Sequence, residues 1–137
     1  MAGKPHNRTW YIKKLSEVAR KYAKERDGFI CQKCGKESRG SNAHGSHILC
    51  VGQHKNMELN PDNIKCLCYY CHMNWWHKDV LFAAKWFINK FPERYERLMA
   101  EAEFDNKLEL EQLKNLYEAV QSGEDYADAY GRILMRR

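Results

Sequence analysis

Apolar residues recur every three or four positions between residues 9 and 26, with Lys and Arg between them. This spacing predicts an amphipathic helix that buries one face. Asp27 and Gly28 follow directly and are typical of a helix end. Residues 1–8 precede this pattern and are expected to be disordered.

The second half of the chain is also helical by pattern. Stripes of Leu, Phe, Ile and Val predict helices over about residues 81–91, 93–102, 110–120 and 126–135. Pro92 suits the first turn of the second of these helices. Such stripes usually form helix-packing surfaces, so we assign no chemistry to them.

Between these helical regions the chain carries short β-prone runs. Residues 46–51 (Ser-His-Ile-Leu-Cys-Val) and 64–67 are predicted to be brief strands. The polar segment between them ends in the turn sequence Asn-Pro-Asp-Asn at residues 60–63. The aromatic-rich stretch 69–78 is predicted to be a packed helix. We therefore expect an α+β fold that is mostly α.

Length and charge narrow the class of protein. The chain has 137 residues, of which 44% are hydrophobic, enough for one domain with a modest core. No apolar run approaches the roughly eighteen residues that a membrane helix needs, and the first residues lack a secretory signal. We therefore expect a cytoplasmic protein with no membrane partner.

Residues 1–78 hold fourteen Lys and Arg against six Asp and Glu, which indicates either contact with a polyanion or an asymmetric surface.

Four of the six cysteines form two C-x-x-C pairs. The pairs are Cys31 with Cys34 and Cys68 with Cys71. Two such pairs, each supplying two thiolates from a tight turn, are typical of a structural zinc site. A redox pair and two disulfides are the alternatives, but a redox pair should open a helix in a βαβ unit, which the pattern lacks. Cys50 and Cys66 fall in the predicted strands, where we expect small buried side chains.

The histidines around these cysteines follow a specific order. A C-x-x-C pair, a histidine on a β-prone run, an asparagine, and a second C-x-x-C followed at once by histidine resemble the HNH (ββα-metal) endonucleases. The matching residues are Cys31, Cys34, His47, Asn63, Cys68, Cys71 and His72. The lead-in helix and segments 46–48 and 59–63 also resemble the NinG-like phage HNH proteins, which are recombination endonucleases.

This resemblance implies an architecture. A zinc-stapled ββα-metal core would occupy residues 9–78, including the lead-in helix. A C-terminal helical extension over residues 79–137 would pack on that core or mediate dimerisation, which makes a homodimer one expected state.

The resemblance also implies a role for each matching residue. His47 resembles the general base that takes a proton from the attacking water, since imidazole titrates near neutral pH. His72 resembles a ligand of one catalytic divalent ion, either magnesium or another divalent cation. Asn63 resembles the residue that braces the loop and orients His47. Lys55, in the intervening loop, is a candidate contact for the same phosphate.

Ser46 departs from the family's pattern. Many HNH nucleases carry an aspartate directly before the base histidine, and that aspartate also ligates the catalytic ion. Serine is a poor ligand by comparison, so His44 and His77 are the candidate substitutes. His72 and His77 are five positions apart, about 140° around an ideal α-helix, so sharing one ion would require a distorted turn.

Several basic residues are candidate contacts for DNA phosphates, although a solvated charged face is the alternative for about half of them. They are Lys33, Lys36, Arg39, Lys55, Lys65 and Lys78, with further candidates, including Arg20, on the first helix. Such contacts give an affinity that falls with salt and carries little sequence information.

The function predicted from the sequence is a metal-dependent DNA endonuclease that hydrolyses phosphodiester bonds. By resemblance it would act in phage recombination or DNA processing, on branched or structured DNA, in the host cytoplasm. The alternative is a zinc-stapled DNA-binding module without cleavage activity. A helical protein–protein adaptor is a third reading, but it leaves the histidines unexplained.

Overall fold

The first helix, α1, runs from Arg8 to Arg26 in the computed structural model, which describes residues 6–104 and 107–135. Its N-terminus is capped by Asn7, whose side-chain oxygen accepts a hydrogen bond from the backbone N–H of Trp10 at 2.9 Å. The helix predicted over residues 9–26 is thus confirmed. Of residues 1–8, for which disorder is predicted, 1–5 lie outside the described residues. The prediction is wrong for Asn7 and Arg8, which form the N-cap and the first residue of α1.

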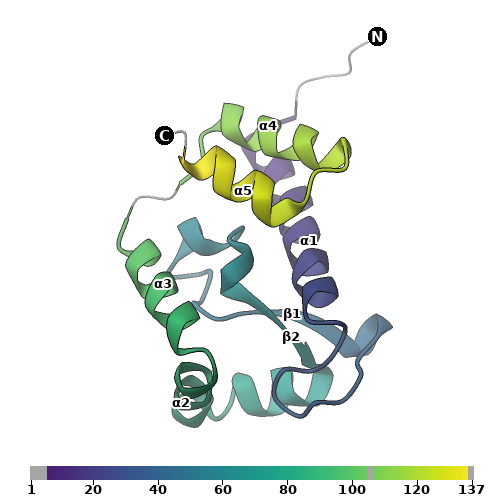
Figure 1. Cartoon of the computed structure of the whole chain (residues 1–137), viewed down its shortest axis with the longest axis vertical. Coiled ribbons are helices and arrows are strands. Elements are labelled where there is room, and N and C mark those ends of the chain that lie inside the picture. Colours follow the sequence, from purple (N-terminus) through teal and green to yellow (C-terminus); the bar gives the residue numbers. More distant parts are fainter. Residues whose placement is uncertain (1–5, 105–106, 136–137) are drawn as a thin grey trace.

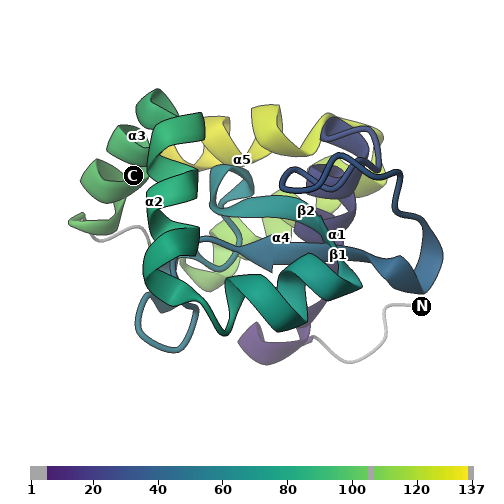
Figure 2. The ribbon, with the colours of Figure 1, turned by 90° about the horizontal axis from the view of Figure 1, so that it is seen from below.

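A small antiparallel sheet packs against α1. It consists of β1 (Ala43–His47) and β2 (Ile64–Cys68), with Ser46 opposite Lys65 in the register. Both strands lie between α1 and the helical segment that follows β2 (Figures 1 and 2). β2 is buried along its whole length because it is covered on both faces.

The first strand lies closer to the N-terminus than the sequence pattern predicts. The predicted strand at residues 46–51 is wrong beyond His47, where the chain leaves the sheet and Leu49 bonds to a side chain instead. Gly45 explains why a segment of low β-propensity pairs here: a Cβ built on it would lie 2.7 Å from the Cβ of Arg20. Its missing side chain lets α1 approach the strand closely.

The helix predicted over residues 69–78 is mostly a π-helix. It spans Cys71–Trp76 (η4), and its bonds include one from the backbone N–H of His77 to the carbonyl of His72 at 3.2 Å. The remaining short helical turns are 3₁₀-helices. They are η1 (Gly40–Asn42), η2 (Lys55–Met57) and η3 (Pro61–Asn63).

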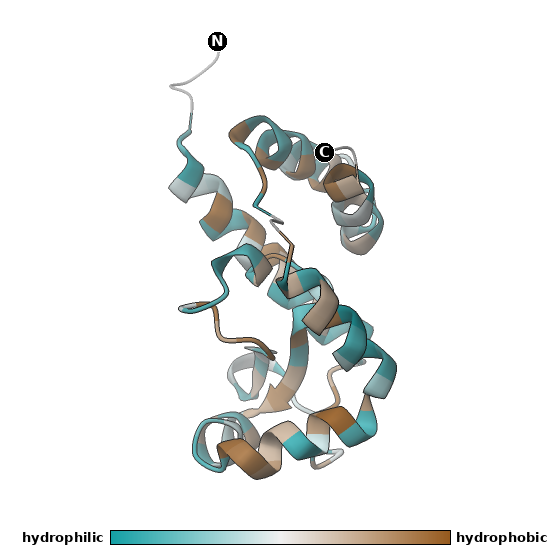
Figure 3. Ribbon diagram, turned by 90° about the vertical axis from the view of Figure 1, so that its left-hand side faces the viewer, coloured by the Kyte–Doolittle hydropathy of each residue, from teal (hydrophilic) through white to brown (hydrophobic). Residues whose placement is uncertain are grey.

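Four helices complete the described chain and confirm the helical pattern of its second half. They are α2 (Val80–Lys90), α3 (Pro92–Ala102), α4 (Leu110–Gln121) and α5 (Tyr126–Met135). In Figure 1, α4 and α5 cover the upper part of α1, whereas α2 and α3 lie on the other side of the sheet. Hydrophobic and hydrophilic segments alternate along these helices (Figure 3). None of the helices within the described residues is long and apolar enough to cross a membrane.

Polar contacts tie the later helices to the turn before β2. Arg94 on α3 donates to the carbonyls of Asp62 at 2.7 Å and Ile64 at 2.6 Å. The hydroxyl of Tyr126 on α5 donates to the carbonyl of Leu59 at 2.6 Å. These contacts fasten the loop between the strands, and the start of β2, to α3 and α5.

Candidate functional site

The four cysteines of the two C-x-x-C pairs converge. Their sulfur atoms all lie within 4.8 Å of one another, and the Sγ atoms of Cys34 and Cys68 are 3.9 Å apart. Four sulfurs each about 2.3 Å from one zinc ion would lie about 3.8 Å from one another. This donor set therefore fits a tetrahedral zinc ion.

The backbone brings the two pairs together. Gly35 follows the first pair with a φ of 79°, and its N–H donates to the carbonyl of Cys31 at 2.9 Å. The N–H of Gln32 donates to the carbonyl of Cys66 at 2.9 Å, which fastens this knuckle to β2. The second pair occupies the end of β2 and the start of η4, so a metal ion here would join both segments.

The two remaining cysteines have different environments. Cys66 is fully buried as predicted, and burial raises the pKa of its thiol to about 11. The prediction of a buried Cys50 is wrong, because the chain has already left the sheet and this side chain is exposed. None of the six cysteines forms a disulfide.

The π-helix places His72 and His77 on one face. In a π-helix residue i+5 bonds back to residue i, so positions five apart are aligned. The Nε2 atoms of the two rings lie 3.0 Å apart. The distorted turn that the sequence required for a shared ion is therefore present.

His44 approaches His72 from the other side. The Nδ1 atoms of the two rings lie 2.9 Å apart, and Nε2 of His44 lies 3.0 Å from the carbonyl oxygen of Ser41. His72 thus has one ring nitrogen facing His44 and the other facing His77. Burial, with the neighbouring histidines, lowers the pKa of His72 to about 4, so this ring is neutral at pH 7.

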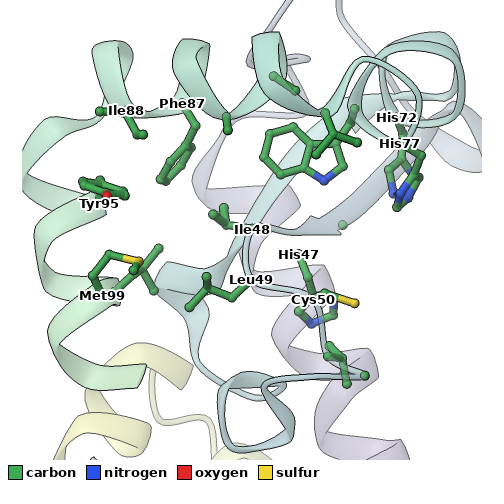
Figure 4. A pocket seen from close by; sticks show the side chains of 18 of the residues that line it. His47, Ile48, Leu49, Cys50, His72, His77, Phe87, Ile88, Tyr95 and Met99 are labelled. Carbon is green, nitrogen blue, oxygen red and sulfur yellow. The ribbon is translucent and has the colours of Figure 1, made fainter. Parts of the chain in front are cut away.

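His47 lies in the same cleft as His72 and His77. The cleft has a volume of about 590 Å³, with these histidines at one end and apolar residues of α2 and α3 at the other (Figure 4). Nε2 of His47 lies 3.0 Å from the carbonyl oxygen of Glu58. Since a carbonyl can only accept, this nitrogen carries the hydrogen and Nδ1 is left with a lone pair. Burial lowers the pKa of His47 below its usual 6.5.

Arg20 adds a positive charge to this cleft. It lines the cleft from α1, and its guanidinium donates to Ser16 Oγ at 2.7 Å. The sequence placed Arg20 only among several basic residues of the first helix. Gly45 is the signal that could have singled it out, because a glycine within a strand often marks a close approach of another segment.

Asn63 is fully buried and braces the loop that leaves β1. Its side-chain oxygen accepts from the N–H of Leu49 at 2.7 Å, and its side-chain nitrogen donates to the carbonyls of Leu49 and Met57 at 3.2 and 3.1 Å. Glu58, which bonds His47, directly follows Met57. The brace therefore holds the segment that orients His47.

Two of the predicted phosphate contacts lie elsewhere than expected. Lys65 is fully buried, and its Nζ donates to Ser46 Oγ at 3.2 Å, so its assignment as a DNA contact is wrong. Lys55 is exposed but lines a neighbouring hollow with Arg8 and Asn56, so the structure does not bring it into the histidine cleft. The other predicted contacts are exposed, namely Lys33, Lys36, Arg39 and Lys78.

The two strands, the helical segment after them and the four convergent thiols define a ββα unit that can hold a metal ion. The chain is 35% identical over 68 residues to a probable HNH endonuclease of Lactococcus phage SK1, a match that covers 46% of this chain and 70% of that protein. On this likeness the chain belongs to the HNH endonuclease family. No protein-family model matches it, and no solved structure matches it.

Proposed function

We propose that this protein is a metal-dependent DNA endonuclease that hydrolyses phosphodiester bonds. The observation that carries the proposal is that His47, His72, His77 and Arg20 line one cleft. This reaction requires a base, a pair of imidazole ligands for the ion and a cationic side chain that contacts the phosphate. The relative from Lactococcus phage SK1 supports the same reaction, since its name describes a probable endonuclease.

His47 acts as the general base in this proposal. Its Nε2 is held by the Glu58 carbonyl, which leaves the Nδ1 lone pair to accept a proton from the attacking water. The lowered pKa keeps the ring unprotonated at neutral pH. Asn63 supports this role by bracing the loop around Met57 and Glu58.

His72 and His77 are the proposed ligands of the catalytic ion, because their Nε2 atoms converge at the histidine end of the cleft. A bound divalent cation would supply positive charge for the phosphate and for the leaving 3′ oxygen. Imidazole suits zinc, nickel and iron better than magnesium, which prefers oxygen ligands. We therefore favour a transition metal among the divalent cations that the sequence left open.

The cysteine cluster is proposed to hold a separate structural zinc ion. Its four thiolates would fasten the first knuckle to the end of β2 and to η4. Because η4 carries His72, the structural ion would keep the ligand helix in place beside β1.

DNA would be held mainly by charge. Arg20 is the proposed contact for the scissile phosphate, since it shares the cleft with His47. The exposed residues Lys33, Lys36, Arg39 and Lys78 would contact flanking phosphates, giving an affinity that falls steeply with salt.

The biological setting follows from the relative and is part of the proposal. We infer a role in phage DNA processing or recombination inside the host cell, with branched or structured DNA as a candidate substrate. A homodimer would supply the two sites that cleavage of both strands requires.

One observation favours a second function, a DNA-binding module without cleavage activity. Among the described residues that line the cleft there is no carboxylate, and Ser46 bonds Lys65 instead of facing an ion. An ion held by two imidazoles alone would be bound more weakly than one with a carboxylate ligand.

A plasmid-nicking assay separates the two functions. The wild-type protein is tested with manganese, nickel, zinc and magnesium beside His47→Ala and a control, His6→Ala, whose ring stacks on Trp10 outside the cleft. We expect His47→Ala to nick at least about 100-fold more slowly while it still shifts DNA. His6→Ala should behave as wild type. If the wild-type protein shifts DNA but nicks it with none of these ions, the binding module is the correct function.

A further inference from the structure

Three histidine rings and one carbonyl form a continuous line of contacts beside the cleft. The line runs from the Ser41 carbonyl to Nε2 of His44, from Nδ1 of His44 to Nδ1 of His72, and from Nε2 of His72 to Nε2 of His77. The three nitrogen-to-partner distances are 3.0, 2.9 and 3.0 Å in that order. Each is short enough for a hydrogen bond.

The carbonyl at one end fixes the direction of the hydrogens. It can only accept, so Nε2 of His44 donates and, in a neutral ring, Nδ1 of His44 keeps a lone pair. That lone pair requires a donor, which is the Nδ1–H of His72. A neutral His72 then has its ring lone pair on Nε2, which faces His77 and the cleft.

We propose that His44 is a positioning residue that fixes the tautomer of His72 so that Nε2 can bind the catalytic ion. This inference rests on the proposed function for the location of that ion, and it removes His44 from the candidate ligands. Outer partners of this kind orient a ligating histidine and raise its basicity. Here the outer partner is itself a histidine, fixed in turn by the backbone.

The competing arrangement places the ion between the two Nδ1 atoms of His44 and His72. Their separation of 2.9 Å would also admit an ion, so distance does not decide between the two sites. The lining of the cleft distinguishes the two sites. His47 and His77 line it together with His72, whereas His44 is not among its lining residues. Figure 4 shows His72 and His77 together at the end of the cleft near His47. An ion at the Nδ1 pair would lie outside the cavity that holds the base.

Two substitutions of His44 test the proposal. Gln keeps one acceptor for His72 and one donor for the Ser41 carbonyl, whereas Leu keeps neither. Nickel ions are titrated by calorimetry into protein whose cysteine cluster already holds zinc. His77→Gln serves as the variant that loses a ligand, and thermal unfolding of each variant checks that it is folded.

We expect His44→Leu to lower the affinity for nickel about 10–100-fold, the usual cost of losing an outer partner. His44→Gln should stay within about threefold of wild type, since the outer contact is retained. His77→Gln should abolish measurable binding. If His44→Gln loses as much affinity as His44→Leu, or if His77→Gln binds as wild type does, the ion lies at the Nδ1 pair and the proposal is wrong.

A second measurement reads the tautomer directly and needs neither nickel nor nuclease activity. Long-range ¹H–¹⁵N spectra of histidine-labelled protein at pH 8 distinguish Nδ1–H from Nε2–H. We expect His72 to carry its hydrogen on Nδ1 in the wild-type protein and in His44→Gln, and to shift toward Nε2–H in His44→Leu. An Nε2–H tautomer in the wild-type protein overturns the proposal. A wild-type protein with the expected tautomer and no nicking activity would contradict the endonuclease assignment alone.

Discussion

The ammonium nitrogen of Lys65 lies 3.2 Å from the ring centroid of Trp76, in a position that is fully buried. Its side-chain hydrogen bond is to the hydroxyl oxygen of Ser46, which is a neutral partner. Burial lowers the pKa of Lys65 well below its usual 10.5, and the nearby Arg94 adds to this effect. In its charged form, Lys65 therefore lowers the free energy of unfolding.

Replacing Lys65 with Met is expected to stabilise the protein at pH 7 by about 1–3 kcal/mol, because a buried amino group, which must be held charged without water or lose its proton on folding, gives way to an apolar side chain of similar length. The gain should shrink as the pH rises toward 10.5. The folded state releases the lysine proton at a lower pH than the unfolded chain does, so the wild type becomes more stable over that range. Thermal unfolding of both proteins between pH 6 and 10 measures the difference.

Lys13→Met is the matched control, since Lys13 is exposed on α1. It should change the free energy of unfolding by less than about 0.5 kcal/mol at every pH. A Lys65→Met protein that is less stable than the wild type would show that the contact with Trp76 outweighs the cost of burial.

The cysteine cluster predicts how stability depends on metal. We expect the purified protein to hold one tightly bound zinc ion, and Cys71→Ser to lose both the ion and cooperative unfolding, because metal binding would be part of the folding free energy. Cys50→Ser is the control, since Cys50 is exposed and outside the cluster. Metal analysis and thermal unfolding provide the measurement. Full zinc content in Cys71→Ser would contradict a four-cysteine site.

Asn63 predicts a link between stability and activity. Asn63→Asp loses both donors of the side chain and sets a carboxylate against the carbonyls of Leu49 and Met57. We expect the free energy of unfolding to fall by about 2–4 kcal/mol. At a temperature where the variant is still folded, nicking should slow while DNA affinity holds, because the loop that orients His47 is no longer braced.

Asn56→Asp is the control for this substitution, because the side chain of Asn56 bonds the carbonyl of Phe104 at an exposed position. It should cost well under 1 kcal/mol. An Asn63→Asp protein as stable as Asn56→Asp would mean that the brace contributes little.

The helices could be predicted from sequence because each shows its own apolar stripe. The pattern over residues 126–135 gave the bounds of α5, and Pro92 marked the start of α3. The two cysteine pairs could also be assigned to one site from the sequence, since a structural zinc ion requires four ligands. These features depend on local spacing or on a fixed ligand count.

The missed features depend on packing between segments that are distant in sequence. Lys65 sits in a strand covered on both faces, which a single lysine in a short β-prone run does not reveal. The strand at Ala43–His47 forms because Gly45 admits α1, not because its residues favour strands. The π-helix likewise has no local sequence signal, yet it aligns His72 with His77.

The pKa of His47 predicts the acidic limb of the pH profile. Burial lowers this pKa below 6.5, although the Glu58 carbonyl partly opposes the shift. The base must be unprotonated, so nicking should be near its maximum at pH 7 and fall about tenfold per pH unit below the pKa. Single-turnover rates between pH 5 and 8 measure this limb. Protonation of His72 would also release the ion, but that effect moves to lower pH as the ion concentration rises. A limb that stays below pH 6.5 at every saturating ion concentration therefore belongs to the base, and one with its midpoint above pH 6.5 would contradict the assignment of His47.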